Sequence, residues 1–179
     1  MMTQKTNRIK ILFLCTGNIC RSPLAEGAFR TMLETSQMTD RIEVSSAGIL
    51  KIHEGEAPDE RAQQVAKIRG FDISHQRARQ ITQNDLELSD VILALDDTHF
   101  RFLQQNLPTK VSADIFPILQ FAPQVGFREV PDPFYGNIEN FFFSMDLIEA
   151  GCAGLLDELR RALHNADRGL RLAVRPPST

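Results

Sequence analysis

The chain has 179 residues, 42% of them hydrophobic, which is typical of a single globular domain with a core of ordinary size. Its formal net charge is −3, so there is no electrostatic reason to expect binding to nucleic acid or to an anionic membrane, and no apolar stretch is long enough to span a bilayer. Three cysteines, an odd number, do not suit a secreted disulfide framework and favour a reducing cytoplasm.

The first predicted element is a strand over residues 9–14. Its nearly continuous apolar run is typical of a parallel strand covered on both faces, and the run, interrupted by Lys10, is too short for the core of a signal peptide. The strand ends at Cys15, and a short loop leads to a predicted helix. Ser22 is expected to be the N-cap of this helix, with Pro23 at its first position.

Strands and helices then alternate along the chain. Strands are predicted over residues 41–47, 91–95 and 113–116, and helices over residues 58–69 and 97–105. Four prolines predict a loop over residues 117–136. A long helix should follow, because apolar residues, among them Cys152, recur at steps of three and four from Phe141 to Leu159. This alternation predicts an open parallel α/β sheet, and such sheets bind ligands at the carboxyl ends of their strands, where Cys15 lies.

Residues 1–164 are predicted to form the domain. Residues 165–179 carry three arginines and two prolines with little periodicity, which predicts a flexible basic tail.

The loop after the first strand has the composition of a phosphate-binding loop with Cys15 as a nucleophile. A free cysteine, with a pKa of about 8.5, is mostly protonated at neutral pH. A loop of inward N–H groups at a helix N-terminus favours the thiolate and also binds a phosphate dianion. Gly17 and Asn18 tolerate the backbone conformations that this requires. Arg21 offers a planar fork to two phosphate oxygens, and Ser22 can donate a hydrogen bond to the sulfur. The predicted loop comprises Thr16, Gly17, Asn18, Ile19, Cys20, Arg21 and Ser22.

This segment has two other interpretations. Cys15 can be a buried structural cysteine before a tight turn, although the strand, Gly, Asn and Arg-Ser-Pro in register disfavour this. A zinc site is disfavoured because Cys15 and Cys20 are five residues apart and the four histidines are scattered.

Three segments resemble the low-molecular-weight protein tyrosine phosphatase family and occur in the family's order. They are the loop at 15–22, Ser-Ser-Ala-Gly at 45–48 and Val-Pro-Asp-Pro-Phe-Tyr-Gly at 130–136, and the resemblance runs from about Ile9 to Leu159. It implies a three-layer α/β sandwich, in which a four-stranded twisted parallel sheet has helices on both faces. It also implies hydrolysis of phosphotyrosine and small aryl phosphates through a cysteinyl-phosphate intermediate, without a metal or other cofactor.

Asp132 matches the general acid of this family. Phosphoryl transfer of this kind needs a proton for the leaving oxygen and then a base to activate water. Pro131 and Pro133 limit the conformations of the segment that presents Asp132. The expected catalytic residues are therefore Cys15, Arg21 and Asp132.

The resemblance also implies supporting residues. Ser46 matches a serine that hydrogen-bonds the loop asparagine, here Asn18. A histidine supports the same asparagine in the family, but Gln76 stands at that position and His75 lies one residue earlier. Gln76 is expected to supply similar bonds, or a small insertion brings in His75, which otherwise is a solvated loop residue.

Two further positions are less specific. The resemblance implies that Cys20 is a redox partner of Cys15, and the alternative is a small buried hydrophobe. After the third strand the family carries Met-Asp and later an asparagine, where this chain has Leu95 and His99. Asp96 is therefore expected to act only through its neighbours, in a mainly structural region.

The cleft residues bear on substrate choice. Phe134 and Tyr135 resemble the aromatic pair that stacks on a phenyl ring in the family. Ile52 and His53 stand where bacterial relatives often have Trp-His, so one aromatic wall is missing and a modest affinity for aryl phosphates is expected.

Alternative functions on the same fold are less well supported. Protein arginine phosphatases carry threonine at the position of Ile19, and arsenate reductases need cysteines that are absent between Cys20 and Cys152. A phosphate-binding module without turnover would be expected to lack the nucleophile, the arginine or the acid. The implied partners are a tyrosine-phosphorylated protein and, by analogy, a tyrosine kinase, with the chain acting as a monomer in the cytoplasm.

Overall fold

The sheet places Cys15 at the carboxyl end of a central strand. A computed structural model describes residues 8–164, so the predicted tail at 165–179 lies outside the described residues. Four parallel strands follow the order β2-β1-β3-β4. They are β1 (Ile9–Cys15), β2 (Ile42–Gly48), β3 (Val91–Ala94) and β4 (Asp114–Pro117).

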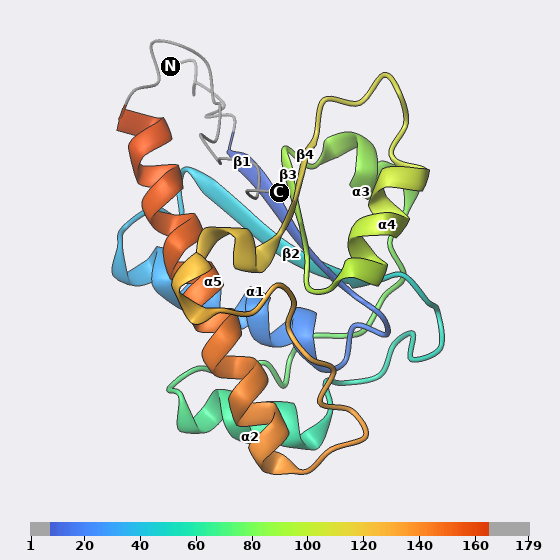
Figure 1. The fold of residues 1–179 in the computed structure, drawn as a ribbon, viewed down its shortest axis with the longest axis vertical. Helices are drawn as coiled ribbons and strands as arrows, with labels where there is room; N and C mark the ends of the chain where they lie inside the picture. Colours follow the sequence, from blue (N-terminus) through green and yellow to red (C-terminus); the bar gives the residue numbers. More distant parts are fainter. Residues whose placement is uncertain (1–7, 165–179) are drawn as a thin grey trace, which may run out of the picture.

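Helices cover both faces of this sheet, as Figure 1 shows. On one face lie α1 (Arg21–Thr35), α2 (Glu60–Ile68) and α5 (Ile138–His164), and on the other lie α3 (Gln83–Leu88) and α4 (Asp97–Asn106). Because side chains alternate along a strand, Ile11 and Phe13 of β1 join the first core cluster and Leu12 and Leu14 join the second. The predicted three-layer α/β sandwich is confirmed.

The start of α1 differs from the prediction. The helix begins at Arg21 with Cys20 at the N-cap, and no side chain caps it. Ser22 is therefore not the N-cap, and its hydroxyl instead contacts Cys15 and Asn18. Pro23 is tolerated within the first turn because the first four N–H groups of a helix have no intrahelical partner.

Short helices also occupy segments where none was predicted. Thr82 and Asp85 form a capping box that begins α3. Within the predicted loop at 117–136, two 3-10 helices form, η1 (Ile118–Phe121) and η2 (Pro123–Val125). A Cβ at Gly154 would lie 1.9 Å from the Phe121 carbonyl oxygen, so glycine in α5 permits the close approach of η1. Within residues 8–164, no helix has the length and apolar character needed to cross a membrane.

Candidate active site

The loop between β1 and α1 is held by the Asn18 side chain. Asn18 is buried with φ 57°, in the left-handed region that Asn tolerates. Its Nδ2 donates to Ser22 Oγ at 2.9 Å and to Ser46 Oγ at 3.0 Å, and its Oδ1 accepts from the Arg79 backbone N–H at 3.0 Å. The amide has three hydrogen bonds that fix its orientation.

Ser22 connects the Asn18 amide to the sulfur of Cys15. Its Oγ lies 2.9 Å from Cys15 Sγ. Because Ser22 Oγ already accepts from Asn18, its own proton is available to the sulfur, with the Ala47 carbonyl oxygen, at 3.3 Å, as the competing acceptor. The arrangement can hold a thiolate at Cys15 by donating a hydrogen bond to it.

The end of β2 contacts the loop between β1 and α1. Ser46 Oγ donates to Glu26 Oε2 of α1 at 2.7 Å, and Glu26 pairs with Arg30 at 2.8 Å. A Cβ at Gly48 would lie 2.7 Å from the Thr16 carbonyl oxygen, so only glycine lets β2 end this close to the loop.

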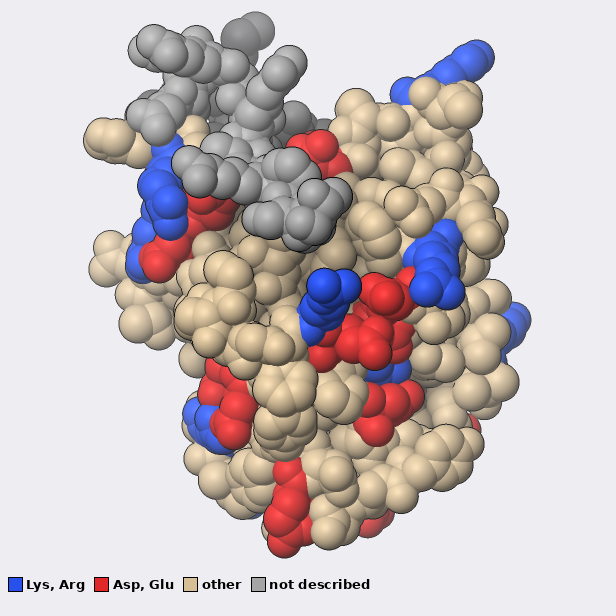
Figure 2. Space-filling model, viewed as in Figure 1, with Lys and Arg blue, Asp and Glu red and all other residues tan. Residues whose placement is uncertain are grey.

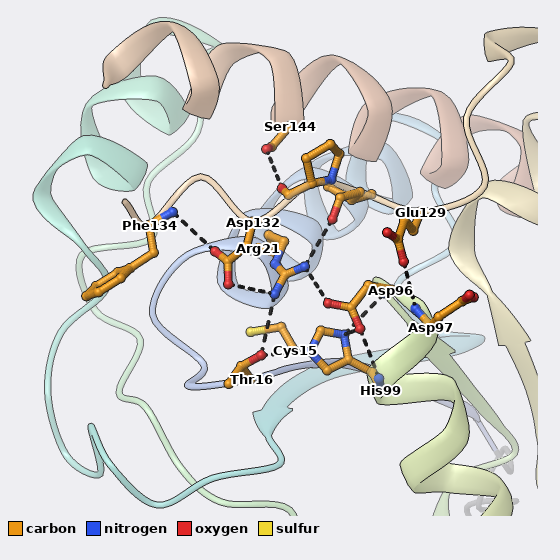
Figure 3. Close-up of polar contacts among 12 residues, drawn as sticks. Cys15, Thr16, Arg21, Asp96, Asp97, His99, Glu129, Asp132, Phe134 and Ser144 are labelled. Carbon is orange, nitrogen blue, oxygen red and sulfur yellow. Dashed lines mark hydrogen bonds and ion pairs between the residues drawn. The ribbon is translucent and has the colours of Figure 1, made fainter. Parts of the chain in front are cut away.

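Arg21 joins three segments that are distant in sequence (Figure 3). Its Nη1 donates to Asp96 Oδ2 at 2.7 Å and to the Val130 carbonyl oxygen at 3.0 Å, while its Nη2 donates to Asp132 Oδ2 at 3.0 Å. The Arg21 side chain is only 3% exposed. Its guanidinium is thus fixed beside Cys15 before any ligand binds.

Asp96 contacts Arg21 directly rather than through neighbours. Burial opposes ionisation of Asp96, but the hydrogen bonds and electrostatic effect of His99, together with the positive charge of Arg21, outweigh it. The pKa of the Asp96 carboxyl therefore lies below its usual range, and this carboxylate keeps its charge beside Arg21.

Asp132 lies on a segment attached to α5. Ser144 Oγ of α5 donates to the Pro131 carbonyl oxygen at 2.9 Å, and Asp132 Oδ1 accepts from the Phe134 N–H at 3.2 Å. The Asp132 side chain is 47% exposed, in contrast to Arg21. It can exchange protons with solvent and with a bound molecule.

A second arginine ties the same segment to α2. Arg61 donates to the carbonyl oxygens of Gly136 at 2.8 Å and Phe134 at 3.0 Å, and pairs with Asp59 at 2.7 Å. Asp59 N–H in turn donates to the Ile19 carbonyl oxygen at 2.8 Å. This Asp59–Arg61 bridge connects the loop at 15–22 with the segment at 130–136, and sequence reasoning did not find it.

Most of the predicted site residues line one cavity of about 140 Å³. An engineered apolar cavity of about 150 Å³ holds benzene, so this volume suits one aromatic ring. Ile52, Phe134 and Tyr135 lie at the cavity, and Tyr135 is 96% exposed. His53, whose ring centroid is 6.1 Å from that of Phe134, lies there as well. The lining residues are Cys15, Thr16, Gly17, Ile19, Cys20, Arg21, Ile52, His53, Asp132, Phe134 and Tyr135.

The charge around this cavity is mixed. Figure 2 shows acidic side chains gathered near the middle of the face drawn. Arg21 is the one Lys or Arg among the lining residues that the structure describes. Glu129 accepts from the Asp97 N–H at 3.1 Å beside this site. Arg21 is therefore the cationic side chain that can bind an anion there, together with uncharged donors such as backbone N–H groups.

One predicted supporting residue makes other contacts than expected. Gln76 does not support Asn18: its Nε2 donates to the Pro23 carbonyl oxygen at 3.2 Å, and the Arg79 backbone takes the place beside Asn18. The prediction was wrong because the Asn18 side-chain oxygen accepts from a backbone N–H, and the identity of a side chain in the sequence does not indicate such a contact. His75 is exposed.

Cys20 is buried within the loop. Burial raises the pKa of its thiol, and the nearby charges of Asp59 and Cys15 raise it further. Among residues 8–164, no group of three or more His, Cys, Asp or Glu side chains could hold a metal ion.

The sequence and the fold of this chain both resemble those of one known protein family. Residues 10–165 match the family model for low molecular weight phosphotyrosine protein phosphatase. A low molecular weight protein-tyrosine-phosphatase of Streptomyces coelicolor is 38% identical over 84% of this chain and 93% of its own length. The fold is similar to the crystal structure of a protein tyrosine phosphatase from Entamoeba histolytica (TM-score 0.82, 33% identity, 86% and 97% of the two chains). A drosophila arginine phosphatase is also similar (TM-score 0.80, 25% identity, 85% and 98%).

Proposed function

The chain belongs to the low molecular weight phosphotyrosine protein phosphatase family and is an enzyme that hydrolyses phosphotyrosine, and we propose that Cys15, Arg21 and Asp132 carry this reaction. The observation that supports the assignment best is the joint position of these groups. One cavity is lined by a thiol 2.9 Å from a hydroxyl donor, by a buried guanidinium, and by a carboxyl 3.0 Å from that guanidinium.

In the first step, the Cys15 thiolate attacks phosphorus while the bond to the tyrosine oxygen breaks. Arg21 and the N–H groups of the loop bind the phosphoryl oxygens. Asp132, in its protonated form, gives its proton to the leaving phenolic oxygen. A neutral Asp132 also attracts Arg21 less strongly, which frees Nη2 for a phosphoryl oxygen, while Asp96 continues to hold Nη1.

In the second step, the Asp132 carboxylate takes a proton from water as the water oxygen attacks phosphorus. The bond between phosphorus and Cys15 Sγ breaks, and inorganic phosphate forms. Ser22 donates its hydrogen bond to the departing sulfur, which returns to the thiolate.

The substrates are phosphorylated proteins, and phosphotyrosine suits the cavity because its ring can pack against Phe134 and Tyr135. We place residues 1–164 in the catalytic domain, to which the match over residues 10–165 lends support. We also propose that the chain acts as a monomer, since one chain supplies the whole site, and in the cytoplasm, since all three cysteines are free. A tyrosine kinase that makes the phosphotyrosine is the implied partner.

The test is hydrolysis of p-nitrophenyl phosphate and phosphotyrosine peptides in the presence of a chelator. We expect turnover that orthovanadate inhibits and that Cys15→Ser abolishes. Asp132→Asn should lower kcat by about 100-fold or more while the affinity for inorganic phosphate changes little, because the amide cannot deliver the proton. Near-normal turnover by Asp132→Asn would exclude it as the acid. Faster hydrolysis of phosphoarginine than of phosphotyrosine would reverse the proposed substrate preference.

A further inference from the structure

A buried histidine contacts the phosphate loop from α4. His99 is fully buried, and its Nε2 lies 3.0 Å from Thr16 Oγ1, the side chain directly after Cys15. A ring in such a position needs a partner for each nitrogen, because an unsatisfied buried polar group is costly. The partners of the two nitrogens therefore decide where the ring carries its proton.

The other ring nitrogen faces the N-cap of α4. The Asp96 backbone N–H donates to His99 Nδ1 at 3.2 Å, and His99 N–H donates to Asp96 Oδ1 at 2.9 Å, which together form a capping box. An Nδ1 that accepts from this N–H carries no proton, so in the tautomer that the capping box requires the neutral ring is protonated at Nε2. The imidazolium, whose Nδ1 would face Asp96 Oδ1 at 2.9 Å, also has a proton at Nε2.

The protonated Nε2 determines the role of the Thr16 hydroxyl. Thr16 Oγ1 accepts from His99 Nε2, and Arg21 Nη2 lies 3.5 Å from it as a second donor. With His99 Nε2 acting as a donor, no other acceptor for the Thr16 O–H is found within the described part of the chain. The Thr16 proton is therefore free for an acceptor in the cavity that Thr16 lines beside Cys15.

We infer that His99 is a positioning residue that makes the Thr16 hydroxyl a hydrogen-bond donor to the bound phosphate. The inference rests on the proposed function, since it assigns one more donor to the same phosphate. Asp96 links the two contacts: it pairs with Arg21 through Oδ2 and caps His99 through Oδ1. His99 thereby couples the start of α4 to both side-chain donors of the site, Thr16 and Arg21.

The main test measures inorganic phosphate binding by titration calorimetry, together with the steady-state kinetics of p-nitrophenyl phosphate. In His99→Asn, the side-chain oxygen can still accept from the Asp96 N–H, but the contact with Thr16 is lost. A hydrogen bond to a charged group is worth about tenfold to a hundredfold in affinity, so the dissociation constant of phosphate and KM should rise together by this factor. The kcat should change by only a few-fold, whereas a purely structural defect would lower the active fraction and leave both constants unchanged.

Thr16 supplies the matched variants. Thr16→Val should weaken phosphate binding as His99→Asn does, and Thr16→Ser, which keeps the hydroxyl, should bind almost as the natural chain does. The double variant His99→Asn with Thr16→Val should be no weaker than either single variant, because both remove the same donor. In nitrogen NMR spectra of the natural chain, His99 Nε2 should be protonated.

Three results would overturn the inference: unchanged phosphate affinity in His99→Asn, losses that multiply in the double variant, or an unprotonated His99 Nε2. These outcomes are separate from the reaction itself. A natural chain that binds phosphate with this dependence on His99 but hydrolyses no phosphate ester would contradict the proposed function and leave the inference standing.

Discussion

Cys15 and Cys20 belong to one loop, yet their surroundings differ. Cys15 Sγ has the Ser22 hydroxyl at 2.9 Å and lines the cavity. Cys20, at the N-cap of α1, is buried, and this burial together with the charges of Asp59 and Cys15 raises the pKa of its thiol. Since the thiolate is the reactive form, Cys20 should be inert at neutral pH. Whether it also pairs with Cys15 on oxidation stays a prediction.

Alkylation distinguishes the two thiols. Iodoacetamide at neutral pH should inactivate the enzyme by modifying Cys15 and should leave Cys20 unmodified, as measured by mass spectrometry of proteolytic peptides. Cys152 serves as the internal control, because burial raises the pKa of its thiol too and it is fully buried in α5, outside the loop that carries Cys15 and Cys20. Modification of Cys20 at a rate close to that of Cys15 would contradict the expected protonated state.

The sequence indicated the individual site residues better than the contacts between them. Cys15 and Arg21 are neighbours in one loop, so their spacing alone brought them together. The direct pairing of Arg21 with Asp96 depends on where β3 ends relative to that loop, which local patterns do not report. The partner of Asn18 was missed for a related reason, because a backbone N–H of Arg79, rather than a side chain, fills that position.

At the scale of elements, α2 holds the segment that carries Asp132. Arg61, in the first turn of α2, lies 4.5 Å above the Phe141 ring of α5 and donates to two carbonyl oxygens of the segment at 130–136. Arg69, at the other end of the same helix, pairs with Asp146 and Glu149 of α5 and lies 5.9 Å above the Phe142 ring. The two arginines make similar contacts with α5, but only Arg61 reaches the segment of Asp132.

These two arginines allow a matched comparison. Arg61→Met should lower kcat by about tenfold to a hundredfold, because a general acid displaced by about 1 Å protonates the leaving group poorly. Inorganic phosphate affinity should change less, since Arg21 keeps its other partners. Arg69→Met should leave kcat almost unchanged and lower only the unfolding temperature. Equal losses of kcat in both variants would mean that α2 acts through general stability alone.

Local patterns predicted most elements, but helix ends depend on contacts. The apolar run of β1 and the periodicity of α5 each specified a buried element. By contrast, serine is a common N-cap residue, and no local pattern in the sequence indicates that the Ser22 hydroxyl contacts the sulfur of Cys15 instead. The 3-10 helix η1 was missed because it packs on Gly154, more than thirty residues away in sequence.

At the scale of the whole molecule, two buried thiols link stability to pH. The pKa values of Cys20 and Cys152 are both raised above the usual range, chiefly by burial. In the unfolded chain a cysteine has a pKa of about 8.5. At pH values below this, the folded and the unfolded chain both keep these two protons, and the stability of the folded state is not reduced. Above it, the unfolded chain loses protons that the folded chain retains, so stability falls as pH rises.

The unfolding free energy should therefore decline above about pH 8.5, by about 1.4 kcal/mol per pH unit for each of the two thiols. Urea unfolding between about pH 7 and about pH 10 measures the slope. Cys152→Ala, although destabilised at neutral pH by the cavity it leaves, should show about half the slope of the natural chain. Identical slopes would show that the Cys152 thiol does not contribute.

Because β1 is a central strand, the active site is completed only when later parts of the chain have been synthesised. Its strand neighbours β2 and β3 follow later in the chain, Asp132 comes after β4, and the supporting helix α5 ends at His164. A nascent polypeptide that has left the ribosome as far as α1 already carries the nucleophile and its arginine, but neither the acid nor the partners of that arginine. Catalysis therefore begins only after α5 has been synthesised, and a chain that stops before this helix cannot release phosphate from its targets.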